Sequence, residues 1–251
     1  MSTTGTGVAP DVRGVLQSQA AVTPEESRQR WMELGLVLLI FIAPLWIISF
    51  STFLRGGALE DRNTTHFLAA CVHEFAALLL LGYVLKRSGR NFGALGIRPS
   101  FGGLGMGAVL WLGVVIVTRL SYYFLQYAHF AIFHQYLRPW DMSGIMGGTA
   151  IWVWVPFILL NPWFEEVLVR GYVMTEVAEL SGSTAFAVLV STAIQTGYHL
   201  YQGPVNTVMV GSCFLLLSLY YARTRKLFPV IVAHTIIDVL AGIHLIYHGR
   251  H

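Results

Sequence analysis

Apolar residues follow one another in seven long runs that are separated by short polar or glycine-containing stretches. A helix that crosses a bilayer needs about 20 mostly apolar residues, and these runs are close to that length. The runs lie near residues 32–53, 66–85, 103–127, 149–170, 184–200, 204–222 and 227–246. The pattern predicts an all-α fold, a polytopic membrane helical bundle of about seven to eight transmembrane helices.

The composition argues against an ordinary soluble domain. Hydrophobic residues make up 55% of the 251 residues and charged residues only 12%, whereas about a quarter of a soluble domain is charged. The two cysteines, Cys71 and Cys213, lie in apolar runs and form neither a metal motif nor a disulfide framework. No repeat is evident, so residues 31–251 are expected to form a single transmembrane domain surrounded by membrane lipids.

Basic residues indicate the orientation of the chain. With the N-terminus inside, eleven Lys and Arg residues lie in inner segments and four in outer segments, which favours a cytoplasmic N-terminus in a multi-pass protein of the cell membrane. This bias accounts for the net charge of +3 without a nucleic-acid partner. Residues 1–30 lack the apolar core of a signal peptide and are predicted to be a flexible cytoplasmic tail. Near its end, "TPEES" carries the capping signals of a helix start.

The fourth run ends in "FEEVLVRG", which places three charged residues where lipid is expected. Charges inside a membrane cost a few kcal/mol each on insertion scales, so they tend to face a cavity or a partner. On a helix, Asn161 and Glu165 share one stripe, while Glu166 and Arg170 are spaced i, i+4 on the adjoining stripe. We therefore expect Arg170 to pair with Glu166 and to leave Glu165 free as a proton acceptor.

Two further polar clusters lie in the fifth and seventh runs. Gln195 and His199 share a helical face with Tyr198 beside them, and His234 and Asp238 are again spaced i, i+4. Each cluster alone is as compatible with a structural role, as a packing histidine or an ion pair, as it is with a functional role. Together they favour a functional site, because groups from three helices can meet only around a common polar cavity.

The ordered motifs "EEVLVR", "QTGYH" and "HTIID" resemble those of the CAAX protease and bacteriocin-processing family of intramembrane glutamic endopeptidases, also called the ABI family. The family pattern is EExxxR, then FxxxH, then Hxxx(N/D), and the similar region covers about residues 150–245. The chain departs from it at Gln195, where the family usually has Phe. Asp238 occupies a position that is Asn in the prenyl-protein endopeptidases.

The resemblance implies a role for each motif residue. Glu165 and His199 would polarise a water molecule for attack on a peptide carbonyl. Glu166 and Arg170 would hold the carboxylates in place. The implied activity is hydrolysis of membrane-associated peptide or protein substrates, in maturation of the CAAX type or in bacteriocin self-immunity.

His234 would stabilise the tetrahedral oxyanion, and Asp238 would orient the ring of His234. No cofactor is required by this scheme. A zinc ion held by Glu165, His199 and His234 is the second possibility, although the His-Glu-x-x-His spacing of a strong zinc motif is missing.

Two other functional classes stay open at this stage. Relatives of such proteases can act as non-catalytic membrane scaffolds or regulators, and buried Glu, His and Asp residues also form proton pathways in transporters. A straight reading of the fifth run places His199 near the outer face and Arg170 towards the inner face. A tilted, broken or re-entrant helix would bring them together.

The second run also carries polar residues, namely His66, His73 and Glu74. They lie outside the family motifs, and we interpret them as interfacial and packing groups.

Overall fold

The structure is a computed structural model that describes residues 23–56, 63–137 and 150–248. In these ranges the chain forms helices and no strand, as the apolar pattern predicted. The rods are α1 (Pro24–Val37) continued by η2 (Leu38–Ile42) and α2 (Ala43–Leu54), α3 (Thr64–Arg87), α4 (Phe101–Phe133), α5 (Ile151–Glu165) continued by η5 (Glu166–Val173) and α6 (Met174–Ser181), α7 (Thr184–Tyr198), α8 (Gly203–Thr224) and α9 (Phe228–His248). Two short 3-10 turns, η3 (Phe92–Leu95) and η6 (Leu200–Gln202), join neighbouring rods.

Each of the seven predicted runs corresponds to one rod, but the rods differ in length. Within the described residues, five are long and apolar enough to cross a membrane: Pro24–Leu54, Thr64–Arg87, Phe101–Phe133, Ile151–Ser181 and Leu200–Thr224. α9 contributes a shorter apolar stretch, Phe228–His244. α7 has 15 residues, which is about 22 Å of helix against a hydrocarbon core of about 30 Å. The all-α membrane bundle is confirmed, with α7 too short to cross by itself.

The first helix begins where its capping signals predicted. The Thr23 hydroxyl accepts a hydrogen bond of 3.2 Å from the backbone N–H of Glu26, and the Glu26 carboxylate accepts one of 2.9 Å from the N–H of Thr23. This reciprocal arrangement satisfies two helix-terminal donors. Because α1 starts at Pro24, the last part of the predicted tail is helical, and residues 1–22 lie outside the described residues.

Two glycines let α4 pack closely against α9. A Cβ atom at Gly107 would lie 2.5 Å from the side chain of Val232, and one at Gly103 would lie 2.7 Å from the ring of Phe228. Small residues four apart are a common way for membrane helices to bring their backbones together. The contact fixes the position of α9 and hence of His234.

The segments that were predicted to face the cytoplasm lie together at one end of the bundle. Arg30 of α1 and Arg90, after α3, both pair with Glu176 of α6, a side chain that is almost fully buried. Arg30 also pairs with Glu179. The loop before α4 joins the same end, because the Gly96 carbonyl accepts a 3.0 Å hydrogen bond from the N–H of Leu227.

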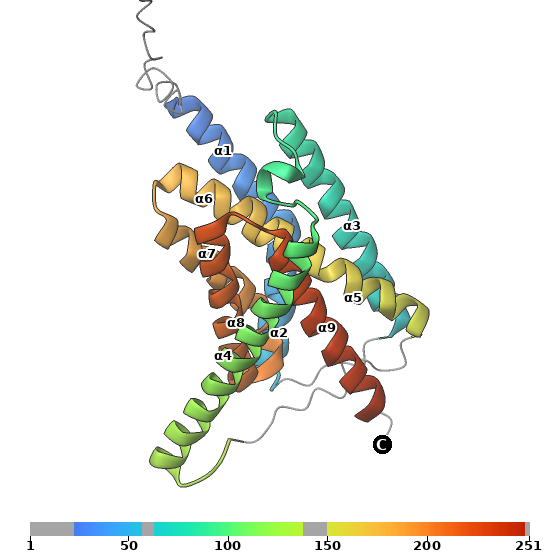
Figure 1. Ribbon diagram of the computed structural model, residues 1–251, viewed down its shortest axis with the longest axis vertical. Helices are drawn as coiled ribbons and strands as arrows, with labels where there is room; N and C mark the ends of the chain where they lie inside the picture. Colours follow the sequence, from blue (N-terminus) through green and yellow to red (C-terminus); the bar gives the residue numbers. More distant parts are fainter. Residues whose placement is uncertain (1–22, 57–62, 138–149, 249–251) are drawn as a thin grey trace, which may run out of the picture.

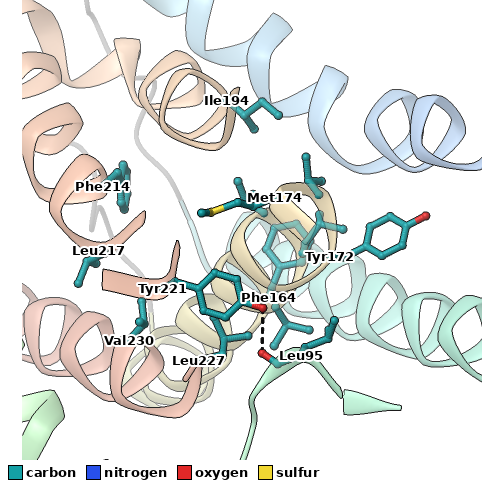
Figure 2. Packing of buried hydrophobic residues seen from close by; sticks show 14 of the residues in the cluster. Leu95, Phe164, Tyr172, Met174, Ile194, Phe214, Leu217, Tyr221, Leu227 and Val230 are labelled. Carbon is teal, nitrogen blue, oxygen red and sulfur yellow. Dashed lines mark hydrogen bonds between the residues drawn. The ribbon is translucent and has the colours of Figure 1, made fainter. Parts of the chain in front are cut away.

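The rod formed by α5, η5 and α6 crosses the bundle from the right to the upper left of Figure 1. Every residue from Phe164 to Val177 in it is buried. Figure 2 shows the apolar packing around it, including Tyr221, whose hydroxyl donates a 3.1 Å hydrogen bond to the carbonyl of Leu95. The two glutamates of "FEEVLVRG" therefore lie inside the protein and not in lipid.

The contact between α4 and α9 yields a stability prediction. Gly107→Leu should lower the free energy of unfolding by about 1–3 kcal/mol, because the larger side chain would overlap Val232. Gly105→Leu is the matched control, since a Cβ at Gly105 meets nothing within 4 Å. Thermal unfolding in detergent, followed by tryptophan fluorescence, measures both. Equal midpoints for the two variants would contradict this packing.

Candidate active site

A change in helix type positions the two glutamates. α5 contains Pro156 and Pro162, and the helix becomes a π-helix at Glu166. Proline supplies no backbone N–H and disturbs the preceding helical turn. At the end of the π-helix, the N–H of Met174 donates to the carbonyl of Val169, five residues earlier. Such wide turns are frequent at functional sites.

Glu166 and Arg170 form the predicted ion pair, and both side chains are fully buried. The second guanidinium NH₂ group of Arg170 donates a 3.2 Å hydrogen bond to the backbone carbonyl of Phe214, and the guanidinium carbon lies 5.1 Å from the centroid of the Phe214 ring. Arg170 therefore connects the central rod to α8.

Glu166 also binds His234 of α9. Its Oε1 lies 2.6 Å from Nδ1 of His234, while its Oε2 pairs with Arg170. Both oxygens of this carboxylate are thus engaged by cationic or hydrogen-bonding partners. The short contact also shows that Glu166 is the closer partner of the His234 ring, a position that the sequence interpretation assigned to Asp238.

The opposite edge of His234 faces two other carboxylates. Its Nε2 lies 3.6 Å from Oδ1 of Asp238 and 3.9 Å from Oε2 of Glu165. The side chain of Asp238 is 24% exposed, which makes Asp238 the most accessible of these carboxylates. The predicted His234–Asp238 neighbourhood is present, and Glu165 adjoins it.

Glu165 is held by two neutral amides. Its Oε1 accepts a 3.2 Å hydrogen bond from Nδ2 of Asn161, and its Oε2 accepts a 3.3 Å hydrogen bond from Nε2 of Gln195. Gln195 is fully buried, and its Oε1 has no hydrogen-bond partner in the described residues. The departure from Phe therefore places a polar group directly on Glu165. The two glutamates have different environments, as expected, because only Glu166 pairs with an arginine.

His199 lies at the C-terminal end of α7. Its Nδ1 contacts the Gln195 carbonyl oxygen at 2.8 Å, and its ring lies 5.1 Å from that of Phe214. A carbonyl can only accept, so Nδ1 carries the hydrogen and Nε2 is the free acceptor of the neutral ring. Across the described residues, no hydrogen bond or ion pair joins His199 to Glu165. The pair that was expected to polarise one water molecule is not in direct contact.

Of the tilted, broken or re-entrant helix expected near His199, the structure contains the broken helix. α7 ends at Tyr198, the chain makes the 3-10 turn η6, and Gly203, the first residue of α8, has a positive φ of 81°. Since α7 is also short, His199 is carried at the end of a broken helix. Tyr198 is buried beside it, with ring centroids 4.8 Å apart.

Glu74 of α3 belongs to the same hydrogen-bonded group, which the sequence interpretation missed. Nδ2 of Asn161 donates to Oε1 of Glu74 at 3.1 Å as well as to Glu165. Glu74 is 4% exposed, so it is not interfacial, and its Oε2 is buried without a hydrogen-bond partner in the described chain. The signal that could have identified Glu74 from the sequence was its position as an acidic residue in the middle of an apolar run. His66 and His73 do match the interpretation: His66 caps α3, and His73 packs against Phe rings.

The alternative zinc ligands are not assembled. Glu165 and His234 approach each other, but no described hydrogen bond or ion pair joins His199 to either of them. Within the ranges that the structure describes, no three His, Cys, Asp or Glu residues form a group that could hold a metal ion. The arrangement instead provides one carboxylate held by amides, a second held by cations, and two histidines with different partners.

Residues 147–240 are similar to a known protein family. This region matches the family model described as Rce1-like, type II CAAX prenyl endopeptidase. No curated protein and no solved structure matches the chain. The matched region includes all six motif residues from Glu165 to Asp238 and excludes Glu74. The resemblance seen in the three motifs is thereby confirmed, because residues 147–240 are similar to the Rce1-like type II CAAX prenyl endopeptidases, a match consistent with the CAAX protease and bacteriocin-processing family.

Proposed function

We propose that the protein is an intramembrane endopeptidase in which Glu165 activates water for attack on a peptide bond. The observation that carries the proposal is the different environment of the two adjacent glutamates. Glu166 is committed to Arg170 and His234, whereas Glu165 receives hydrogen bonds only from amides. Glu165 has no arginine partner and lies farther from His234 than Glu166 does, which makes Glu165 the better proton acceptor of the two.

In the proposed first step, the water oxygen bonds to the substrate carbonyl carbon while one water proton passes to Glu165. The carbonyl oxygen then bears the developing negative charge. His234 is the group best placed to donate to it through Nε2, which faces Glu165. With Nδ1 donating to Glu166, Nε2 carries a hydrogen in the doubly protonated ring. Three nearby carboxylates complement the charge of that form.

In the second step, the C–N bond breaks and the proton on Glu165 passes to the leaving amine. The products are a carboxylic acid and an amine, and no oxidant or reductant is consumed. His199 lies at the end of α7, and its Nε2 can accept a hydrogen bond. We propose that His199 contacts the attacking water from the side on which the substrate binds. That assignment requires the water or substrate to bridge His199 and Glu165.

The proposed substrates are membrane-associated peptides or proteins, in CAAX-type processing or in bacteriocin self-immunity. The family description supports the first of these. We further propose that the protein lies in the cell membrane with its N-terminus in the cytoplasm. The basic segments around Arg30, Arg90 and Arg225 share one end of the bundle, as the positive-inside rule requires of a cytoplasmic face.

The central test replaces the proposed base. Glu165→Gln should keep the fold but lower kcat/KM by about 10²–10⁴-fold, because an amide cannot accept the water proton. Cleavage of a quenched peptide library in proteoliposomes measures this, with the exposed Glu25→Gln as control. The wild type is also assayed with and without a chelator. Full activity of Glu165→Gln would refute the mechanism, and loss of wild-type activity with chelator would move the assignment to a metalloprotease.

Arg170 should prove structural rather than chemical. Arg170→Met leaves the Glu166 carboxylate buried without its main counter-charge, which typically costs about 3–5 kcal/mol of stability. Thermal unfolding in detergent should show a large decrease for Arg170→Met and almost none for Glu165→Gln. A stable Arg170→Met variant that has lost only activity would indicate instead that the arginine contacts the substrate.

Glu74 should act on catalysis through Asn161. Glu74→Gln retains an oxygen that accepts from Asn161, whereas Glu74→Leu removes the acceptor and frees the amide that holds Glu165. We expect Glu74→Leu to lower kcat by up to about 10²-fold through misplacement of Glu165, with KM little changed, and Glu74→Gln to restore most of the activity. Equal losses in the two variants would show that the charge of Glu74, and not its position, matters.

A further inference from the structure

A second polar site lies at the basic end of the bundle. It is a pocket of about 580 Å³ between the loop before α4, the start of α4 and the loop that joins α8 to α9. In Figure 1 these are the green loop leading into α4 and the red loop leading into α9, which lie side by side. The pocket shares no residue with the candidate active site.

Three cationic side chains line this pocket, namely Arg98, Arg225 and Lys226, and its lining includes no acidic residue. Arg98 and Lys226 are exposed, and neither forms an ion pair with a described acidic residue. Arg30 and Arg90 lie at the same end of the bundle, but both of them form ion pairs with Glu176. The pocket therefore concentrates positive charge that has no paired acidic residue in the part of the chain that the structure describes.

The backbone that carries these cations is fixed. A Cβ atom at Gly96 would lie 1.9 Å from the Arg225 carbonyl oxygen, so the two loops are in contact. Gly96 has a φ of +86°, which an L side chain rarely adopts. Arg225 itself donates a 3.0 Å hydrogen bond to the hydroxyl of Thr175 and lies 5.0 Å from the centroid of the Tyr221 ring.

The pocket also supplies hydroxyl donors of the kind that bind oxyanions. The Ser100 hydroxyl oxygen accepts from the N–H of Gly103 at 3.0 Å, which leaves its own hydrogen available to a ligand. Arginine guanidinium groups and hydroxyls together match the acceptor oxygens of a phosphate group.

Exposed apolar side chains lie beside this pocket. Phe101, at the start of α4, is 93% exposed, and Leu104 and Met106 follow it with 47% and 41% exposure. Met106 also lines the pocket. An anion bound by the three cations would have apolar helix surface directly below it, which suits acyl chains attached to a headgroup.

We propose that this pocket binds a phosphate group, supplied by an anionic phospholipid headgroup whose acyl chains run along α4. The chemistry is shared by free phosphate, so the source is decided by experiment. Basic pockets between membrane helices favour anionic lipid headgroups. The proposal does not depend on the protease assignment, because none of the pocket residues touches Glu165 or the histidines.

The test uses full-length protein in detergent, with phosphatidylglycerol, phosphatidylcholine or inorganic phosphate added separately. Native mass spectrometry counts retained lipid, and thermal unfolding reports stabilisation. We expect phosphatidylglycerol to be retained in preference to phosphatidylcholine. Arg98→Gln combined with Lys226→Gln should weaken that binding about tenfold or more.

The matched control is Lys86→Gln combined with Arg87→Gln, which removes the same two charge types from the same end outside the pocket. This variant should bind phosphatidylglycerol almost as wild type does. Equal weakening in both variants would overturn the proposal in favour of general surface charge, and so would equal retention of the two lipids without any response to phosphate. Stabilisation by inorganic phosphate alone, lost in the pocket variant, would support the phosphate site and assign it to a free anion. Unfolding without ligand checks that each variant is folded.

Discussion

The bundle depends on one buried carboxylate, Glu166, and on the cations that bind it. Arg170 and His234 occupy its two oxygens, and Arg170 continues to the carbonyl of Phe214. Three rods, the central one with α8 and α9, are therefore joined by charge-assisted hydrogen bonds between buried groups. Glu165 can differ from its neighbour only because Glu166 has already engaged these partners.

Much of this arrangement could be predicted from the spacing of residues in the sequence. The i, i+4 intervals correctly predicted the Glu166–Arg170 pair and the His234–Asp238 neighbourhood, and the capping signals at Thr23 correctly predicted the start of α1. These features are local, so helix periodicity is sufficient to predict them. The apolar runs likewise predicted the rods, because burial in lipid demands long apolar helices.

The contacts between distant segments could not be predicted in the same way. Spacing within α9 indicated Asp238 as the partner of His234, but Glu166 on another rod approaches more closely. Glu74 joins Glu165 only through Asn161, a link that depends on how α3 packs against α5. The π-helix at Glu166 also has no signal in the apolar pattern, although Pro162 marks the place where the regular helix is disturbed.

The short α7 has a consequence for the lipid around it. Its Phe186 and Leu189 side chains are 48% and 63% exposed, so this helix faces the surroundings of the bundle. A helix of about 22 Å beside a hydrocarbon core of about 30 Å creates a mismatch that lipids relieve by thinning. His199, at the end of this helix, would then lie beneath a local depression of the bilayer. Under the proposed function, such a depression would shorten the path of water and a peptide substrate from the aqueous phase to a carboxylate in the interior of the protein.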